Sequence, residues 1–398
     1  MSADGAGGAG GAGASGDAVG SCGASGSASA RTSVRPRDLG VPFGGAPGPA
    51  NAITDVPGTH VGMRTRIEGA YDDPHGGPVV RTGVTVVHPL GPDAAGGVAA
   101  GRFVFNGMGE MTGGALLDEY GVLYGPLALT NTLSVGVVRD ALVAWSVRRG
   151  LDPRDLRGRT KPVVSETWDG RLNDVYGQHL RAEDVWAAAD GATDGPVREG
   201  SVGGGTGMTS FGFKAGTGTA SRRVAHPLGP FVLGALVQSN FGRREQLTVA
   251  GVPVGRLLQA PDPVEPEPPR GDGSIVVLLA TDAPLLPSQL TAVAKRATLA
   301  LGRVGSIGST TSGDLFLAWS TANRSRYLER DLRRFEAVPT ERLDPLFQAA
   351  VEATEEAIVS ALVAAEPMSG VGGAWYPSLP HARLRAVLAR HGRLADGA

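Results

Sequence analysis

The chain has 398 residues, of which 41% are hydrophobic and 19% are charged, and its 37 basic and 39 acidic residues leave a formal net charge of −2. This balance excludes a general nucleic-acid binder, which needs a basic excess, and a strongly acidic tail protein. No apolar run approaches the roughly 18 residues of a membrane span, and a single cysteine, Cys22, excludes an internal disulfide framework and a cysteine-based zinc site.

The chain starts with a long stretch of glycine, alanine and serine that has almost nothing to bury. Such a composition is typical of a flexible segment, so we predict a disordered tail over residues 1–45 and no catalytic role for Cys22. The stretch has neither the charged start nor the apolar centre of a secretory signal, and we therefore expect a cytoplasmic protein. Residues 46–398 are enough for one large domain or two of average size.

The rest of the chain combines apolar strands with helical patterns. β-Branched and apolar runs predict strands at residues 78–89, 103–105, 161–164, 231–237 and 275–280. Apolar residues at helical spacing predict helices at residues 133–149, 287–301 and 344–365. Residues 260–270 are rich in proline and glutamate without apolar periodicity, which predicts an exposed, extended linker.

The richest glycine stretch, residues 200–208, fits no phosphate-binding motif. The sixth-position glycine of the dinucleotide fingerprint is missing, and no Gly-Lys-Ser/Thr sequence occurs. The stretch indicates backbone that lies close to a ligand or to another strand, or else a set of tight turns.

The sequence lacks the conventional hydrolase motifs. It contains no HExxH, no CxxC and no Gly-x-Ser-x-Gly nucleophile elbow, and its seven histidines are scattered. A lone histidine is more often structural than catalytic, so a Ser-His-Asp hydrolase has no support.

Ser274 offers a different route to a nucleophile. It follows Gly273 and stands at the start of the apolar run of residues 275–280. If the bond between Gly273 and Ser274 broke, the free α-amine, with an ordinary pKa of about 7.7–8.0, could act as general base for the serine hydroxyl. On local sequence alone, a plain Gly-Ser turn that enters a strand is the simpler interpretation.

A second hydroxyl-rich cluster lies further along the chain. Ser312 and Asp314 precede another apolar run, and a hydroxyl and a carboxylate at a strand end could orient the α-amine and relay a proton. The alternative is the ordinary use of serine and aspartate in caps and turns.

Several motifs together resemble the DmpA/BapA type of aminopeptidase, the self-processing β-peptidyl and D-stereospecific aminopeptidases of peptidase family S58. The resemblance covers roughly residues 50–385. Each motif alone is weak, and the combination is specific. The motifs are NAITDVPG (51–58), NGMGEMTG (106–113), TNTLSVG (130–136), SVGGGTGM (201–208), GTGTASR (216–222), SNFG (239–242), GSIVVLLATDAP (273–284) and SGD (312–314).

The resemblance implies an α/β fold, a four-layer αββα sandwich like that of N-terminal-nucleophile hydrolases but with different connectivity. It also implies a single αββα domain over residues 46–398, cut between Gly273 and Ser274 into an α fragment, 1–273, and a β fragment, 274–398. Relatives assemble as homo-oligomers of αβ units, and we expect a tetramer.

The resemblance further implies roles for individual residues. Ser274 would be the nucleophile, first on Gly273 and then on substrate, while Ser312 and Asp314 complete the proton relay. Asn240 would donate its side-chain amide to the oxyanion.

The substrate contacts follow in the same way. Glu166 would meet the terminal ammonium of the substrate, and Asn106 and Trp168 would line its site. Trp168 departs from the family pattern, which commonly has a tyrosine there, because an indole N–H donates a hydrogen bond but offers no hydroxyl. Arg243 and Arg244 are interpreted as solvated surface residues, and the alternative is that they bias the mouth of the site toward anionic groups.

The sequence thus predicts a serine aminopeptidase or amidase that releases small N-terminal residues from short peptides, amides or esters through an acyl-enzyme. Its partner would be a small peptide or amide substrate, with no metal or organic cofactor, no nucleic acid and no membrane. Two alternatives stay open. One is a hydrolase of non-peptide amide oligomers or an acyltransferase of the same superfamily, which typically has threonine at the cleavage point. The other is a non-catalytic binding or structural relative.

Overall fold

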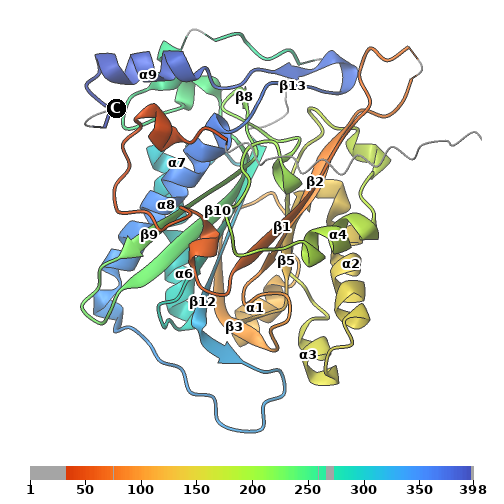
Figure 1. The fold of residues 1–398 in the computed structure, drawn as a ribbon, viewed down its shortest axis with the longest axis vertical. Helices are drawn as coiled ribbons and strands as arrows, with labels where there is room; N and C mark the ends of the chain where they lie inside the picture. The colour runs from red at the N-terminus through yellow and green to blue at the C-terminus, as the bar shows by residue number, and fades with distance from the viewer. Residues whose placement is uncertain (1–32, 75, 259, 266–272, 396–398) are drawn as a thin grey trace, which may run out of the picture. The chain divides into compact units, whose positions relative to one another are not determined.

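Two β-sheets stack face to face at the centre of the fold, as Figure 1 shows. The structure is a computed structural model that describes residues 33–74, 76–258, 260–265 and 273–395. The larger sheet has the strand order β4 (Val122–Tyr124), β3 (Gly97–Gly107), β12 (Gly313–Ser325), β11 (Gly273–Thr281), β10 (Phe231–Phe241), β9 (Thr217–Val224). The smaller sheet has the order β1 (His60–Glu68), β2 (Val80–His88), β5 (Leu127–Asn131), β6 (Val164–Thr167).

The larger sheet is buried on both faces. Along β11, Val276 and Leu278 belong to the apolar cluster between the sheets, which also contains Leu127 of β5, whereas Val277 belongs to the cluster on the opposite face. Successive side chains of a strand point to opposite faces. The side chain of Ser274 therefore points toward the smaller sheet.

Helices cover the outer face of each sheet. α8 (Asp344–Val363) packs on β9 and β10, and α6 (Pro287–Lys295) packs on β3 and β12. α2 (Val135–Arg148) packs on β5 and β6, and α4 (Ala182–Asp190) packs on β1 and β2. The layers run helix, sheet, sheet, helix, which confirms the expected αββα sandwich. Shorter elements are α1 (Gly114–Tyr120), α3 (Pro153–Gly158), α5 (Val254–Leu257), α7 (Ala297–Arg303), α9 (His381–Arg390), β7 (Thr209–Ser210), β8 (Phe213–Lys214), β13 (Met368–Ser369) and β14 (Trp375–Tyr376).

The predicted strands and helices form, with some changes at their ends. The helix predicted at residues 287–301 is divided at Arg296 into α6 and α7. The strand predicted at residues 161–164 begins only at Val164, because pairing with β5 starts there. Residues 260–265 of the predicted linker are exposed or half-exposed, and its residues 266–270 lie outside the described residues.

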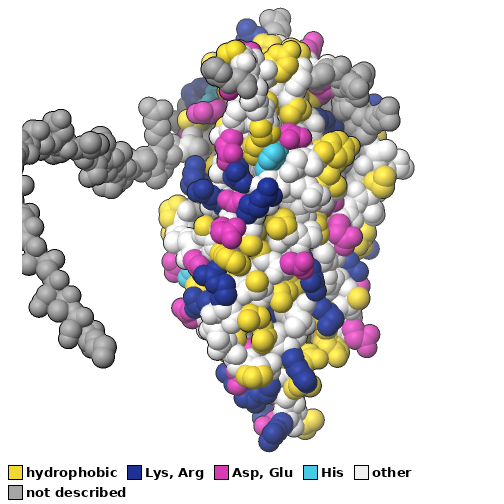
Figure 2. Space-filling view, turned by 90° about the vertical axis from the view of Figure 1, so that its right-hand side faces the viewer, with side chains coloured by type: hydrophobic (Ala, Val, Ile, Leu, Met, Phe, Trp, Pro, Cys, Tyr) yellow, Lys and Arg dark blue, Asp and Glu magenta, His cyan; other side chains and the backbone are white. Residues whose placement is uncertain are grey.

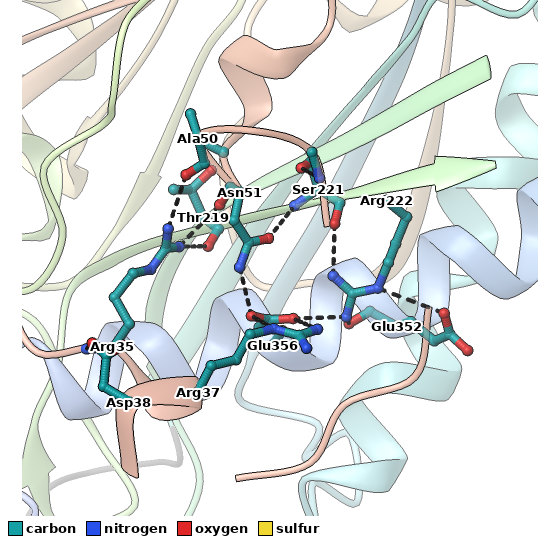
Figure 3. A network of polar contacts seen from close by, with 12 residues as sticks. Arg35, Arg37, Asp38, Ala50, Asn51, Thr219, Ser221, Arg222, Glu352 and Glu356 are labelled. Atoms are coloured by element: carbon teal, nitrogen blue, oxygen red, sulfur yellow. Dashed lines mark hydrogen bonds and ion pairs between the residues drawn. The ribbon is translucent and has the colours of Figure 1, made fainter. Parts of the chain in front are cut away.

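Ion pairs with a buried carboxylate fasten the N-terminal segment to α8 (Figure 3). Arg37 donates two hydrogen bonds of 2.7 Å to the carboxylate of Glu356, which also lies 2.8 Å from Nη2 of Arg222. Nearby, Val41 is only 1% exposed.

Residues 33–45 are therefore packed, and the prediction of a disordered tail is wrong for them. Their arginines pair with a carboxylate far away in the sequence, which local composition does not reveal. The predicted tail residues 1–32, including Cys22, lie outside the described residues.

Basic and acidic side chains are interspersed on the face shown in Figure 2, without a patch of one sign. This mixture agrees with the formal net charge of −2. Within the described ranges, no helix is both long and apolar enough to cross a membrane.

Candidate active site

Ser274 lies in the second position of β11, between β10 and β12. It pairs with Asn240 of β10, and the preceding residue, Gly273, pairs with Phe241. Ser274 is 7% exposed, and its Oγ accepts a hydrogen bond from the backbone N–H of Gly313 at 3.2 Å. The hydroxyl is thus held at the end of a buried strand.

Gly273 has a conformation that only glycine tolerates here. Its φ is +85°, and a Cβ on this residue would overlap the carbonyl oxygen of Asn240. The peptide carbonyl before Ser274 is therefore held in a backbone geometry that other residues could not adopt without displacing β10.

Ser312, Asp314 and Asn106 form one hydrogen-bonded group beside this strand. Ser312 Oγ donates to Oδ1 of Asp314 at 2.6 Å, and Nδ2 of Asn106 donates to Oδ2 at 2.7 Å. Burial raises the pKa of Asp314, while these two hydrogen bonds oppose the rise. The register between β3 and β12 shifts directly after Asp314, and such an irregularity can redirect a side chain at a site.

Asn240 is fixed by two hydrogen bonds. Its Oδ1 accepts from the backbone N–H of Thr209 at 2.9 Å, and its Nδ2 donates to the carbonyl oxygen of Trp168 at 2.9 Å. An amide nitrogen carries two N–H groups, so one donor is left for an oxyanion beside the paired Ser274. The side chain is 1% exposed, which strengthens such a bond.

Glu166 provides a buried carboxylate on the side of β12 and β3. Its Oε1 accepts from the backbone N–H of Glu110 at 2.9 Å, and its Oε2 accepts from the hydroxyl of Thr132. A Cβ on Gly109 would lie 3.4 Å from this Oε1 and 3.3 Å from Cα of Gly313. The carboxylate therefore lies close to Gly313, the first residue of β12, whose N–H bonds Ser274. Burial raises the pKa of Glu166, which its hydrogen bonds oppose.

Asn106 and Trp168, which were expected to line the substrate site, are each hydrogen-bonded to another candidate site residue. Asn106 is bonded to Asp314. Trp168 meets Asn240 through its carbonyl oxygen, and its ring packs edge-on against Tyr176 with 6.2 Å between centroids. Tyr176 is 79% exposed, so these two rings lie at the rim of the site.

The glycine stretch of residues 200–208 packs against other strands. A Cβ on Gly204 would lie 2.6 Å from the carbonyl oxygen of Leu129, and one on Gly205 would overlap the backbone of Thr217. Of the alternatives open from the sequence, close approach to neighbouring strands accounts for these glycines.

Sequence reasoning missed Lys214, which is fully buried. Its Nζ donates to the carbonyl oxygens of Met208 at 2.7 Å and Ala215 at 2.6 Å, and burial lowers its pKa to about 7. Because Thr209, the residue after Met208, bonds Asn240, the lysine supports the backbone that holds Asn240. The apolar neighbours of Lys214 in the sequence were the signal that could have indicated its burial.

Sequence reasoning also missed Thr132, whose hydroxyl donates a hydrogen bond to Glu166, although this residue belongs to the TNTLSVG motif.

Arg244 is not the solvated residue that was predicted. Its side chain is 16% exposed and its guanidinium lies 4.2 Å from the ring centroid of Phe213, whereas Arg243 is exposed as expected.

Several known proteins are similar to this chain. Peptidase family S58 matches residues 51–375 of the chain. A β-peptidyl aminopeptidase BapA of Sphingosinicella microcystinivorans is 48% identical over 380 residues, which cover 92% of this chain and 95% of that protein.

Two solved structures are similar. The L-aminopeptidase D-Ala-esterase/amidase of Ochrobactrum anthropi matches with a TM-score of 0.83 and 44% identity, covering 91% of this chain and 99% of the other. A protein of Pyrococcus horikoshii OT3 matches with a TM-score of 0.84 and 41% identity, covering 91% and 100%.

The stacked sheets and their flanking helices define a variant of the N-terminal-nucleophile hydrolase fold, as in the Ochrobactrum structure. More specifically, the chain belongs to peptidase family S58. The family resemblance of its motifs is thereby confirmed.

Proposed function

We propose that this protein is a self-processing serine aminopeptidase or amidase with Ser274 as its nucleophile. The observation that carries the proposal is the position of the Ser274 hydroxyl. Ser274 follows a glycine whose φ of +85° and close approach to Asn240 disfavour any side chain, pairs with Asn240, and accepts a hydrogen bond from Gly313, the first residue of β12.

Maturation begins with attack of Ser274 Oγ on the carbonyl carbon of Gly273. The C–N bond breaks, the nitrogen keeps the electron pair and takes a proton, and an ester links Gly273 to the serine oxygen. Water then hydrolyses this ester. The products are a Gly273 carboxylate and a Ser274 with a free α-amine and a free hydroxyl.

Turnover uses the same hydroxyl on substrate. The α-amine of Ser274 takes the hydroxyl proton while Oγ attacks the scissile carbonyl, and the amide of Asn240 donates to the developing oxyanion. The leaving amine takes the proton, and water hydrolyses the acyl-enzyme. Glu166 pairs with the substrate ammonium, which restricts cleavage to the first residue.

The preferred substrates would be short peptides, amides or esters with a small N-terminal residue. The printed activities of the similar proteins, a β-peptidyl aminopeptidase and an L-aminopeptidase D-Ala-esterase/amidase, support this range. We include in the proposal a cytoplasmic location and assembly of the αβ units into a homotetramer.

The decisive experiment is the intact mass of freshly purified protein, compared with Ser274→Ala and with Ser288→Ala, an exposed serine of α6. Two fragments that meet between Gly273 and Ser274 are expected in the wild type and in the Ser288 variant. They should be absent from the Ser274 variant.

Turnover of a β-alanyl or glycyl anilide should follow the same pattern among the three proteins. An uncut wild-type chain would overturn the self-processing mechanism. Correct cleavage without turnover on a broad panel of amides and esters would instead favour a non-catalytic relative.

A further inference from the structure

A pocket lined by arginine side chains lies next to the site, on the side of β10. The strand register defines its position, because Asn240 pairs with Ser274, Phe241 pairs with Gly273, and the next residue, Gly242, lines the pocket. Thr209, whose N–H bonds Asn240, lines it as well. The pocket therefore begins directly beyond the oxyanion side of the nucleophile.

The pocket and Glu166 lie on opposite sides of Ser274. In the strand order of the larger sheet, β12 and β3 flank β11 on one side and β10 flanks it on the other. The carboxylate of Glu166, a residue of β6, lies close to Gly109 in the turn after β3, and Gly109 in turn lies against Gly313 of β12. A substrate with its ammonium at Glu166 and its scissile carbonyl at Ser274 would extend its leaving portion toward the pocket.

Three arginines, Arg171, Arg243 and Arg244, line this pocket together with two carboxylates, Asp262 and Glu265. Arg244 has a structural task, because it donates to the carbonyl oxygens of Gly212 at 2.6 Å and Pro261 at 2.8 Å and lies 3.6 Å from Asp262.

Arg171 is placed differently. Its Nη1 donates to the hydroxyl of Thr209 at 3.2 Å, so its guanidinium lies at the wall nearest to Asn240.

Glu265 shows that a carboxylate fits in this pocket. Burial raises the pKa of Glu265, and the positive charge of Arg171 opposes the rise, so the two groups interact electrostatically. The neighbouring Val264 is held by a pair of backbone hydrogen bonds with Trp375, of 2.8 and 2.9 Å. Glu265, in the chain segment that precedes the proposed cleavage site, thus lines the same pocket as Arg171.

We propose that the Arg171 pocket is a binding subsite for the carboxylate of the leaving portion of a peptide substrate, and that Glu265 competes for it. The inference rests on the proposed function. It identifies the substrate class as short peptides with a free carboxyl terminus, in preference to peptides with a blocked one. A guanidinium offers a planar pair of donors to a carboxylate, which an amide end cannot match in charge.

The test compares β-alanyl-glycine with β-alanyl-glycinamide, as the ratio of their kcat/KM values on the full-length protein. Arg171→Met should lower the acid-to-amide ratio about tenfold, because the charge-assisted bond is lost. Arg171→Lys should lower it less, because the charge stays while the planar pair of donors is lost. Glu265→Gln should raise the ratio about threefold, because the internal competitor is neutralised.

The matched controls are Arg303→Met and Glu355→Gln, which break a pair of 2.9 Å between α7 and α8. They should leave the ratio unchanged. The leaving aniline of the β-alanyl anilide carries no carboxylate, so turnover of this anilide by the Arg171 variants separates this inference from the proposed function.

A ratio that stays constant in the Arg171 and Glu265 variants, while the anilide is still cleaved, would overturn the subsite alone. A decrease of the ratio in both the Arg171 and the Glu265 variants, in place of the two opposite shifts, would mean a structural role for both residues. This result would also overturn the subsite. A wild-type protein that cleaves no anilide would overturn the proposed function and the subsite together.

Discussion

Replacing Asp314 with asparagine tests whether its carboxylate holds the proton relay in place. In the wild type, one oxygen accepts from Ser312 at 2.6 Å and the other from Asn106 at 2.7 Å. Asparagine has one acceptor oxygen, so one of these donors would face an NH2 group. Hydrogen bonds to a charged group contribute about 1.5–3 kcal/mol each, so losing one bond while the other loses its charged acceptor should cost about 3–5 kcal/mol. This corresponds to a kcat about 10²- to 10⁴-fold lower.

The assay must separate maturation from turnover. Intact mass gives the fraction of cut chain, and kcat on a β-alanyl anilide is then expressed per mature Ser274. The control is Asp118→Asn, which removes a 56% exposed carboxylate that lies 2.6 Å from Arg102. The relay argument would be refuted by a mature Asp314 variant whose kcat stays within about threefold of the wild type.

The pH dependence gives an independent check. Burial raises the pKa of Asp314, so its carboxylate becomes protonated at a less acidic pH than an exposed aspartate would. Wild-type kcat should therefore fall as the pH decreases through that raised pKa. The asparagine variant cannot be protonated there and should lack this part of the acid limb.

Three further changes address cleavage, substrate binding and stability. Gly273→Ala places a Cβ on the carbonyl oxygen of Asn240 at a φ of +85°, and processing followed by intact mass should slow about tenfold or more. Glu166→Gln removes the counter-charge of the substrate ammonium and should raise KM about tenfold. Wild-type KM should rise as the pH falls through the pKa of Glu166, which burial raises. Glu356→Gln leaves Arg37 without its buried partner and should lower the free energy of unfolding in urea by about 3 kcal/mol.

Each of these changes has a control. Gly302→Ala adds a methyl group into open space and should not alter processing. An N-acetylated substrate has no ammonium group. If Glu166→Gln raised the KM of this substrate as much as that of the free amine, the proposed role of Glu166 would be contradicted. Glu355→Gln breaks only the pair with Arg303, whose side chain is 46% exposed, and should change stability by less than about 1 kcal/mol. Equal losses in the Glu355 and Glu356 variants would contradict the argument from burial.

Local patterns were sufficient for the strand in which Ser274 stands, whereas its role as nucleophile was predicted only from the family resemblance. A glycine, a serine and a β-branched apolar run mark the start of β11, and the structure has the strand there. Asp314 and Ser312 are close in sequence, so their hydrogen bond is a local one. Such features depend on neighbours along the chain, which sequence reasoning can follow.

The contacts that sequence reasoning missed join residues far apart. Arg37 and Glu356 are separated by 319 positions, and Glu166 and Thr132 by 34. Lys214 is buried because two carbonyl oxygens of folded backbone receive its ammonium group. No periodicity or local composition encodes these pairings, since they exist only after the two sheets have stacked.

The register of β11 connects the fold with the chemistry. A slip of one residue against β10 would turn Ser274 to the helix-covered face and move it away from Asn240. The close fit of Gly273 in β11 against Asn240 in β10 opposes such a slip. Gln238 of β10 donates to the carbonyl oxygen of Thr130 at 2.8 Å and to the hydroxyl of Thr167 at 2.9 Å, which ties β10 to the smaller sheet. The same contacts that fix the sheet thus keep Ser274, Asn240 and Glu166, the proposed nucleophile, oxyanion donor and ammonium-binding carboxylate, in the space between the sheets.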